Sequence, residues 1–344
     1  MTNQAPPQSV EQLEQLLSEP APEVVQLMGE LQGDIIFLGV GGKMGPTMAR
    51  MARRASDLAG VKRRVIGVSR FSKPDLRQRL ESWSIETVAC DLLDPGAVSQ
   101  LPDASLVISM SGYKFGTAQN PEVTWATNCL VPTWVCQRFR HSRIVTFSTG
   151  NVYGYVPPAS GGSVETDEEQ PDGEYAMAAV GRERMYAYFS KEWGIPTIIL
   201  RLNYATELRY GVLVDLAQQI QQGRPIDVTM GYVNVIWLGD ANNMSLLALR
   251  HANTPARVVN LAGHEVLSTR EVAHRLAERM ETTVTCTGKE ASTALLSNGH
   301  LGYQLWGRPE VNAEEMVCWT ADWITNGRPT LGKPTHFEVT DGKF

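Results

Sequence analysis

The feature that most constrains the fold is an alternation of short apolar runs and amphipathic segments that starts near residue 34. Apolar runs of strand length lie at 35–40, 65–68, 85–89, 106–109, 144–147 and 197–200. Segments with helical periodicity lie at 44–58, 74–82, 95–100, 121–139 and 174–193. Continuous apolar strands separated by helices indicate a parallel sheet covered on both faces. The alternation therefore predicts an α/β protein with a Rossmann-like, doubly wound parallel sheet.

The chain outside this alternation divides into an extension and a smaller region. Residues 1–32 predict a helical N-terminal extension, with amphipathic helices at 10–17 and 22–31. Residues 33–205 form the main domain in this interpretation, and 229–263 return to its sheet. The segments 206–228 and 264–344 then make up a smaller substrate-binding region. Pro132 inside the long 121–139 segment predicts a kink or a break there.

Glycines follow the first apolar run at the start of the next helix. Gly39 permits a sharp turn, Gly42 lets the backbone approach a ligand, and Gly45 lets the helix pack closely on the strand. The unpaired N–H groups and the dipole of a helix N-terminus favour a phosphate at this place. Because the glycines follow a strand in the first of several βα units, they predict a dinucleotide-binding turn. Residues 33–205 are therefore the predicted dinucleotide-binding domain.

The end of the second strand bears on the choice of dinucleotide. NAD-binding proteins usually place an acidic residue there, which binds the adenosine ribose. This chain has Ser69 and Arg70, whose donors and positive charge suit a 2′-phosphate, and Lys43 in the glycine turn favours the same ligand. The sequence predicts NADP as the cofactor, with NAD as the alternative, since Arg70 also suits stacking on an adenine ring.

Composition and charge exclude several classes of protein. The net charge of −6 and the lack of a concentrated basic surface argue against a nucleic-acid partner. No run of eighteen apolar residues predicts a membrane span, and the acidic first 42 residues do not resemble a secretory signal. The 5 cysteines form no Cys-x-x-Cys pair, and the histidines show no metal-binding spacing. We expect a cytoplasmic protein without a metal site, whose partner is a small-molecule substrate.

Several motifs together resemble the extended short-chain dehydrogenase/reductase family, the NAD-dependent epimerase/dehydratase group. The resemblance spans about 34–325 and rests first on the glycine motif. It also rests on Cys90-Asp91-Leu92, Asn128, Ser148 to Gly154, and Asn234 to Asp240. It implies that Asp91 meets adenine and that Thr149 takes the position of the catalytic hydroxyl.

The same resemblance implies a Tyr-x-x-x-Lys pair, in which lysine holds the nicotinamide ribose and lowers the pKa of the tyrosine. The matching tyrosine is Tyr175, but the lysine position is Ala179, and no lysine follows any tyrosine by four residues. An unassisted tyrosine, with a pKa of about 10, is a poor base but a suitable proton donor to a carbonyl. Lys114, in the loop after the fourth strand, is the first candidate for a substitute cation. Arg182 is the second, although it lies about 10 Å along the helix from Tyr175.

The substrate expectation follows from a second departure. Nucleotide-sugar enzymes of the family carry a Gly-Asp-Gly…Arg segment that grips a pyrophosphate, and 226–233 lack it. We therefore expect a small hydroxy or keto compound, such as a sugar or sugar acid, and not a nucleotide sugar. Arg209 is a candidate contact for a substrate carboxylate. The expected function is an NAD(P)-dependent oxidoreductase or epimerase, and the alternative raised by Ala179 is a catalytically silent NADP(H)-binding sensor or scaffold.

The expected site thus has two parts. The catalytic residues are Thr149, Tyr175 and Lys114. The cofactor-binding residues are Gly39, Gly42, Lys43, Met44, Gly45, Ser69, Arg70, Asp91, Leu92, Met110, Ser111 and Tyr175. The resemblance also implies a homodimer that uses the helices at 121–139 and 174–193.

Overall fold

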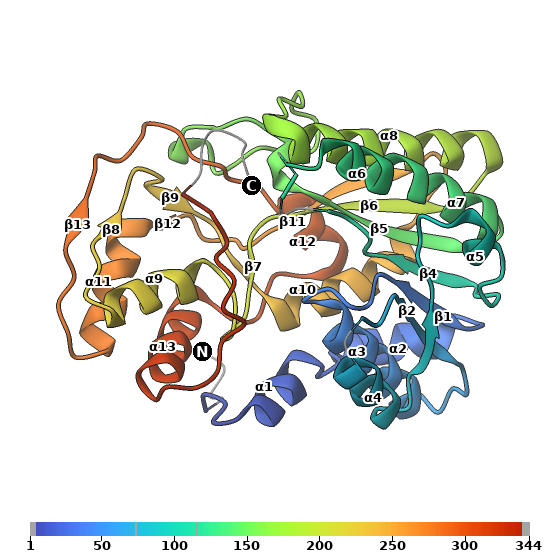
Figure 1. The fold of residues 1–344 in the computed structure, drawn as a ribbon, viewed down its shortest axis with the longest axis horizontal. Helices are drawn as coiled ribbons and strands as arrows, with labels where there is room; N and C mark the ends of the chain where they lie inside the picture. Colours follow the sequence, from blue (N-terminus) through green and yellow to red (C-terminus); the bar gives the residue numbers. More distant parts are fainter. Residues whose placement is uncertain (1–4, 73, 114–115, 118, 339–344) are drawn as a thin grey trace.

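The computed structural model describes residues 5–72, 74–113, 116–117 and 119–338. A seven-stranded sheet, ordered β11-β6-β5-β4-β1-β2-β3, forms its centre (Figure 1). The strands are β1 (Ile35–Leu38), β2 (Val65–Ser69), β3 (Glu86–Ala89), β4 (Leu106–Ser109), β5 (Arg143–Thr149), β6 (Thr197–Leu202) and β11 (Arg257–Leu261). Every neighbouring pair in the sheet is parallel. The predicted α/β class with a doubly wound parallel sheet is confirmed.

Both faces of the sheet are buried, which explains the continuous apolar runs. Ile35 and Phe37 of β1 pack in the core on one face, whereas Ile36 and Leu38 pack in the core on the other. The first core includes side chains of α2 (Pro22–Glu30), α3 (Gly45–Leu58) and α10 (Leu238–Leu247). The second includes side chains of α7 (Val131–Arg138) and α8 (Gly173–Trp193). Strand order reverses between β1 and β4, and ligands of such sheets bind at the carboxyl ends of strands at this point.

The segment expected as one long helix is divided. It consists of α6 (Pro121–Trp125), a π-helical turn η1 (Ala126–Leu130) and α7. Pro132 has no N–H to donate, and its ring would clash with the carbonyl four residues earlier in a regular helix. The wider hydrogen-bonding of η1 just before Pro132 is the observed form of the predicted break.

Two further helices of the main domain are α4 (Pro74–Ser82), which packs on β3, and α5 (Pro95–Ser99), which packs on α7. The expected extension contains α1 (Val10–Leu17) and α2. Leu13 and Leu17 of α1 are buried in the core of the C-terminal lobe, whereas α2 packs on the sheet. The helix α1 therefore belongs to both halves of the molecule.

The C-terminal lobe has its own core around three helices, α9 (Val212–Gln221), α11 (Thr269–Arg279) and α13 (Ala313–Thr325). Of the segment expected to return to the sheet, β11 is the part that pairs with it. The two-residue strands β9 (Tyr232–Val233) and β10 (Ile236–Trp237) instead pair with β12 (Leu267–Ser268) and β7 (Ala205–Thr206). The short strands β8 (Ile226–Asp227) and β13 (Cys286–Thr287) also pair, and α12 (His300–Trp306) packs on β11.

After α13 the chain runs back toward the sheet, as the red segment beside β7 in Figure 1 shows. The Leu331 N–H donates to the Arg209 carbonyl over 2.9 Å, and Thr335 donates to the Asp215 carboxylate of α9. Among the described helices, none is both long and apolar enough to cross a membrane. Within the same residues, no group of three or more His, Cys, Asp or Glu side chains is placed to hold a metal ion.

Candidate active site

The glycine turn joins β1 to α3 at the carboxyl edge of the sheet. Gly39 has a φ of +86°, which favours glycine, and a Cβ at Gly45 would lie 2.2 Å from the Val40 carbonyl oxygen. A Cβ at Gly42 would meet only the Gly39 carbonyl oxygen, at 3.6 Å. Packing therefore requires glycine at 39 and 45 but leaves open space above 42. No side chain caps the N-terminus of α3, so its N–H groups face this space without a side-chain acceptor.

A cleft of about 970 Å³ begins at this turn and runs over β2, β3 and β4. Gly39 and Gly42 line it together with Ser69, the last residue of β2, and Arg70, the next residue. Its other walls include Asp91, Leu92, Ser111 and Gly112. Met110 packs against the core on the α3 side of the sheet. The cleft gathers most of the predicted cofactor residues from strands that are distant in sequence.

A second cavity of about 850 Å³ adjoins the other side of the glycine turn. Lys43 and Met44 of the turn line it, as do Thr149 at the end of β5 and Tyr175 in the first turn of α8. The structure thus places the two predicted catalytic residues that it describes in one cavity. Lys114, the third, lies outside the described residues.

The Thr149 hydroxyl is engaged in local hydrogen bonds. It accepts the Asn151 N–H over 3.2 Å and donates to the Asn151 Oδ1 over 2.9 Å. These bonds fix the side chain at the start of the short 3₁₀ turn η2 (Gly150–Val152). Because Thr149 and Asn151 also line the cavity, the pair presents a fixed hydroxyl and amide to a ligand.

Lys43 lies in the cavity rather than beside Ser69 and Arg70. Its Nζ is 3.1 Å from the centroid of the Tyr210 ring. Tyr210 belongs to a tight turn after β7, in which it exchanges backbone hydrogen bonds with Glu207. The position of Lys43 therefore gives no support to a 2′-phosphate at the adenosine end, and places a positive charge beside Thr149 and Tyr175.

Tyrosines form much of this cavity wall. Tyr204 and Tyr210 line it beside Tyr175, and burial raises the pKa of both Tyr204 and Tyr210. Tyr204 also has a φ of +40°, which is strained for a bulky residue. Such backbone strain persists only where surrounding contacts impose it and is frequent at ligand sites. The hydroxyls of Tyr204 and Tyr210 therefore remain protonated at neutral pH.

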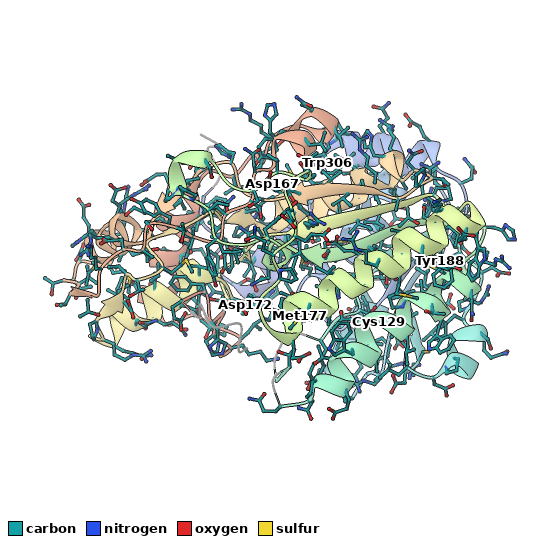
Figure 2. The ribbon with its side chains drawn as sticks, turned by 90° about the horizontal axis from the view of Figure 1, so that it is seen from above. Cys129, Asp167, Asp172, Met177, Tyr188 and Trp306 are labelled. Carbon is teal, nitrogen blue, oxygen red and sulfur yellow. The ribbon has the colours of Figure 1, made fainter. Side chains whose placement is uncertain are left out.

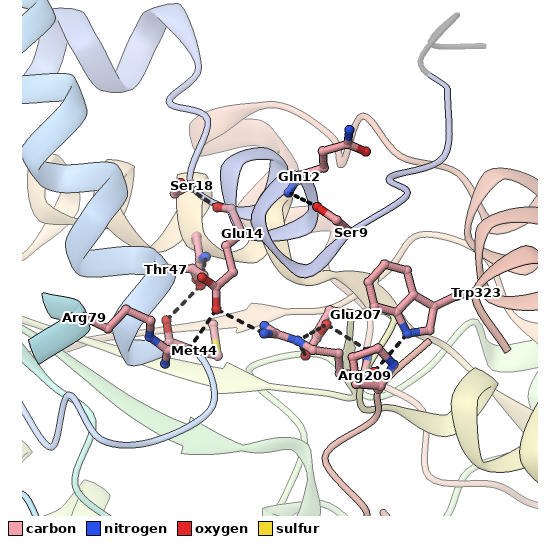
Figure 3. A network of polar contacts seen from close by, with 12 residues as sticks. Ser9, Gln12, Glu14, Ser18, Met44, Thr47, Arg79, Glu207, Arg209 and Trp323 are labelled. Atoms are coloured by element: carbon pink, nitrogen blue, oxygen red, sulfur yellow. Dashed lines mark hydrogen bonds and ion pairs between the residues drawn. The ribbon is translucent and has the colours of Figure 1, made fainter. Parts of the chain in front are cut away.

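An ion-pair network includes one residue of the cavity wall (Figure 3). Glu207, which lines the cavity, is bound by the Arg209 Nε over 3.1 Å. The Arg209 Nη1 also lies 3.0 Å from Glu14 of α1, which pairs in turn with Arg79 of α4. Burial raises the pKa of Glu207, against the attraction of Arg209. Two protein carboxylates hold the Arg209 guanidinium, so the structure gives no support to its expected contact with a substrate carboxylate.

A second network connects β5 to α8 and β6. The Ser148 hydroxyl donates to Glu183 of α8, and Glu183 lies 2.6 Å from the Arg201 Nη2 of β6. Arg201 also pairs with Glu169 and lies over the Tyr153 ring. Burial opposes the charge of Arg201, but its hydrogen bonds and attraction to Glu183 outweigh burial and raise its pKa. This network fixes β5 and α8 relative to each other and thereby sets the positions of Thr149 and Tyr175.

The lysine position of the family motif is filled by apolar packing. Ala179 is fully buried and packs with Val152, Tyr153 and Val180. Arg182, one turn further along α8, is buried, and its Nη1 donates to the Ser111 carbonyl and to the Asn128 side chain. The second candidate cation therefore contacts the wall of the cofactor cleft.

Sequence reasoning missed Glu207, Tyr204 and Tyr210. Their segment follows β6 directly, and residues after the carboxyl end of a parallel strand are frequent site residues. Their position after β6 was the signal in the sequence that could have identified them. Their grouping with Lys43 in one cavity depends on the tertiary fold.

Comparison with known proteins agrees with the class that this fold and site define. A family model, the NAD dependent epimerase/dehydratase family, matches residues 35–262. The chain belongs to the NAD dependent epimerase/dehydratase family, the extended short-chain dehydrogenase/reductases, as its motifs predict. It is accordingly an enzyme of the oxidoreductase/epimerase type, which supports the enzyme over the binding-only alternative. No curated protein sequence gives a significant match.

Solved structures with the same fold are distant in sequence. A UDP-glucuronic acid 4-epimerase variant from Bacillus cereus, in complex with a fluorinated UDP-sugar acid and NAD, has a TM-score of 0.73 and 18% identity. The alignment covers 86% of this chain and 99% of that chain. The dTDP-glucose 4,6-dehydratase from Bacillus anthracis, in complex with NAD, has a TM-score of 0.72 and 12% identity, over 86% of this chain and 97% of that chain. The UDP-glucose 4-epimerase from Thermotoga maritima, with UDP-glucose, has a TM-score of 0.70 and 15% identity, over 86% and 99%.

These neighbours correct the substrate expectation. The exclusion of nucleotide sugars is wrong, because enzymes of UDP- and dTDP-linked sugars share this fold over nearly their whole length. The exclusion depended on the absence of one phosphate-gripping segment at 226–233. The walls of the cavity come instead from the glycine turn, the end of β5, α8, and the segment 202–212. One missing segment does not decide what such a composite cavity binds.

Proposed function

We propose that the chain catalyses NAD(P)-dependent hydride transfer on the sugar of a nucleotide-linked sugar. The observation that carries this proposal is the convergence of Tyr175, Thr149 and Lys43 in the cavity that adjoins the glycine cleft. A proton donor, a fixed hydroxyl and a cation thus stand together next to the predicted dinucleotide site.

The residues of the cleft fit a dinucleotide. The open space above Gly42 and the uncapped N-terminus of α3 suit a pyrophosphate. Asp91 and Leu92 would meet the adenine, and Ser111 would lie toward the nicotinamide half. When bound, the nicotinamide supplies or accepts the hydride. The chain's own residues then need only orient the substrate and move its proton.

Tyr175 is the proposed proton donor to the reacting oxygen, with Thr149 as its hydrogen-bonding partner on that oxygen. Without a lysine at 179, the tyrosine is suited to protonating a carbonyl while it is reduced. The Thr149 O–H donates to the Asn151 Oδ1 in the free protein and would turn from that acceptor to the reacting oxygen when substrate binds. Lys43 adds a positive field in the same cavity, where oxygen charge develops.

The substrate class follows from the fold neighbours. Fold neighbours are in complex with UDP-linked sugars, so a nucleotide-linked sugar is the proposed ligand.

NADP is the proposed form of the cofactor. Ser69 at the end of β2 and Arg70 directly after it line the cleft. No carboxylate stands at this end of the strand. A serine hydroxyl and a guanidinium suit a 2′-phosphate. Arg70→Glu should therefore reverse the preference toward NAD, as measured by the ratio of the two dissociation constants.

A homodimer is the proposed assembly. The neighbouring helices α6 and α8, together with η1, carry exposed apolar side chains at Val123, Trp125, Leu130, Met177 and Tyr188. Met177 and Tyr188 are eleven residues apart, close to three full helical turns, so they share one face of α8 (Figure 2). The cytoplasm is the proposed compartment, because all five cysteines are free thiols.

The test is an assay of the purified protein with NADPH or NADP⁺ and a panel of UDP- and dTDP-linked sugars and their 4-keto forms. The proposal expects cofactor turnover, or epimerised product by NMR, with at least one nucleotide-linked compound and much less with the matching free sugar. Equal turnover of the free sugar, or no turnover with any nucleotide-linked compound, contradicts the proposal.

A further inference from the structure

Arg182 is buried beside the cofactor cleft. It is 5% exposed and lies in the middle of α8, seven residues after Tyr175. Its Nη1 donates to the Ser111 carbonyl over 3.1 Å and to the Asn128 Oδ1 over 2.7 Å. Ser111 lines the cleft, so the guanidinium contacts the cleft wall from within the protein.

The partners of this guanidinium are neutral. Within the described residues no carboxylate lies at ion-pair distance from Arg182, and its buried Nε has no hydrogen-bond partner. Arg201, equally buried, is held by Glu169 and Glu183. A buried charge without a counter-charge is costly, and its field is poorly screened. The protein therefore maintains a net positive charge at this wall.

A glycine of the cleft wall makes room for the guanidinium. A Cβ on Gly112, which lines the cleft, would lie 2.6 Å from the Arg182 Nη1. Ala179 precedes Arg182 by three residues, about 4.5 Å along the helix axis. Helical side chains lean toward the N-terminus of their helix, so a long side chain at 182 reaches back across that distance. The Arg182 guanidinium thus extends along the axis of α8 toward the position of residue 179.

We infer that Arg182 is a positioning residue that supplies the positive charge absent at Ala179, beneath the Ser111–Gly112 wall of the cofactor cleft. This inference rests on the proposed dinucleotide function. Arg182 acts indirectly, because it donates to the Ser111 carbonyl in the wall of the cleft. Its positive charge acts on the nicotinamide end of the cleft from inside the protein.

A positive charge at this place has a consequence that packing alone would not produce. The oxidised nicotinamide ring is cationic and the reduced ring is neutral, so a nearby buried cation weakens binding of the oxidised form. We define the binding ratio as the dissociation constant of the oxidised form divided by that of the reduced form. Removing the charge should lower this ratio about tenfold.

The experiment measures this ratio by equilibrium titration for the wild type, Arg182→Lys, Arg182→Gln and Arg182→Met, using NADP⁺ with NADPH and NAD⁺ with NADH. The control is Lys191→Met, at an exposed cationic residue of the same helix. We expect a wild-type ratio above one, a lower ratio in the Gln and Met variants, and ratios near the wild type in the Lys and control variants. Thermal melts check that each variant is folded.

Two results overturn the inference. One is a wild-type ratio of one or less, which requires no variant at all. The other is a ratio in the folded Gln or Met variant within twofold of the wild type. If no dinucleotide binds to the wild type, the proposed function itself fails, so the two failures are distinguishable.

Discussion

At the scale of single residues, Tyr175 is the side chain whose removal should affect chemistry most selectively. Tyr175→Phe removes the hydroxyl but keeps the ring, and a lost general acid costs about 100-fold or more in kcat. Cofactor affinity should change little, since the glycine turn provides the main phosphate contacts. Tyr188→Phe, at an exposed tyrosine of the same helix, is the control. Steady-state kinetics with a turned-over sugar check this, and a kcat within threefold of the wild type would rule out the assigned role.

A second prediction at this scale concerns Asp240, which is buried at the start of α10 and accepts the Val311 N–H over 3.0 Å. Burial raises the pKa of Asp240 to about 7, although the Val311 hydrogen bond opposes the change. Because the unfolded pKa is about 3.9, folding favours the protonated form. The stabilisation is complete below pH 4 and is lost as pH rises through about 7.

The size of this pH effect is on the order of 4 kcal/mol at most. Asp240→Asn keeps an acceptor for Val311 but does not titrate, so the variant should lose less stability than the wild type between pH 5 and 8. Denaturant unfolding across that range checks the slope, with exposed Asp57→Asn as the control. Parallel pH dependences for the wild type and Asp240→Asn would show that Asp240 does not titrate in this range.

At the scale of elements, α1 connects the two halves of the molecule through one buried carboxylate. Glu14 pairs with Arg79 of α4 and with Arg209, which also holds Glu207 in the cavity. Glu14→Gln removes this charge from Arg209, which keeps Glu207, and from Arg79, which is 40% exposed, so we expect a loss of about 1–3 kcal/mol. We expect a lower melting temperature and faster proteolysis between α1 and α2. Exposed Glu11→Gln on the same helix is the control, and an unchanged melting temperature for Glu14→Gln would contradict this role of α1.

The face of α8 gives a second prediction at this scale. The neighbouring η1 packs tightly on α8, since a Cβ on Gly181 would lie 3.0 Å from the Cys129 Sγ. The exposed Met177 and Tyr188 then extend from a firmly packed helix. The double variant Met177→Glu with Tyr188→Glu should convert a dimer to a monomer in sedimentation velocity. Leu58→Glu, at an exposed leucine of α3, should not. A wild-type monomer at micromolar concentration would contradict the proposed assembly.

At the scale of the whole molecule, local pattern predicted the sheet because each strand carries its own burial signal. The apolar runs at β1, β2 and β4 specify strands buried on both faces, whatever the rest of the chain does. The glycine turn is equally local. The positive φ at Gly39 and the nearby Val40 carbonyl at Gly45 each require glycine. Fold class and most of the cofactor cleft were therefore predictable.

The cavity was less predictable because its contacts join distant segments. The direction of Lys43 depends on Tyr210, and the pairing of Arg209 depends on Glu14 of the extension. No periodicity encodes such contacts. Similarly, β9 and β10 lie in the segment expected to return to the main sheet, yet they pair with β12 and β7 instead. Side-chain direction and long-range pairing are properties of the assembled fold.

The central claim is that the glycine cleft binds a pyridine dinucleotide, and protection against thermal unfolding tests it most directly. Ligand at 100 times its dissociation constant stabilises a folded protein by about 2.7 kcal/mol. We predict that NADPH and NADP⁺ raise the melting temperature more than NADH and NAD⁺. Gly42→Val should fold normally, because a Cβ there meets only one atom at 3.6 Å, but should lose this protection. No stabilisation of the wild type by any of the four dinucleotides would contradict the claim.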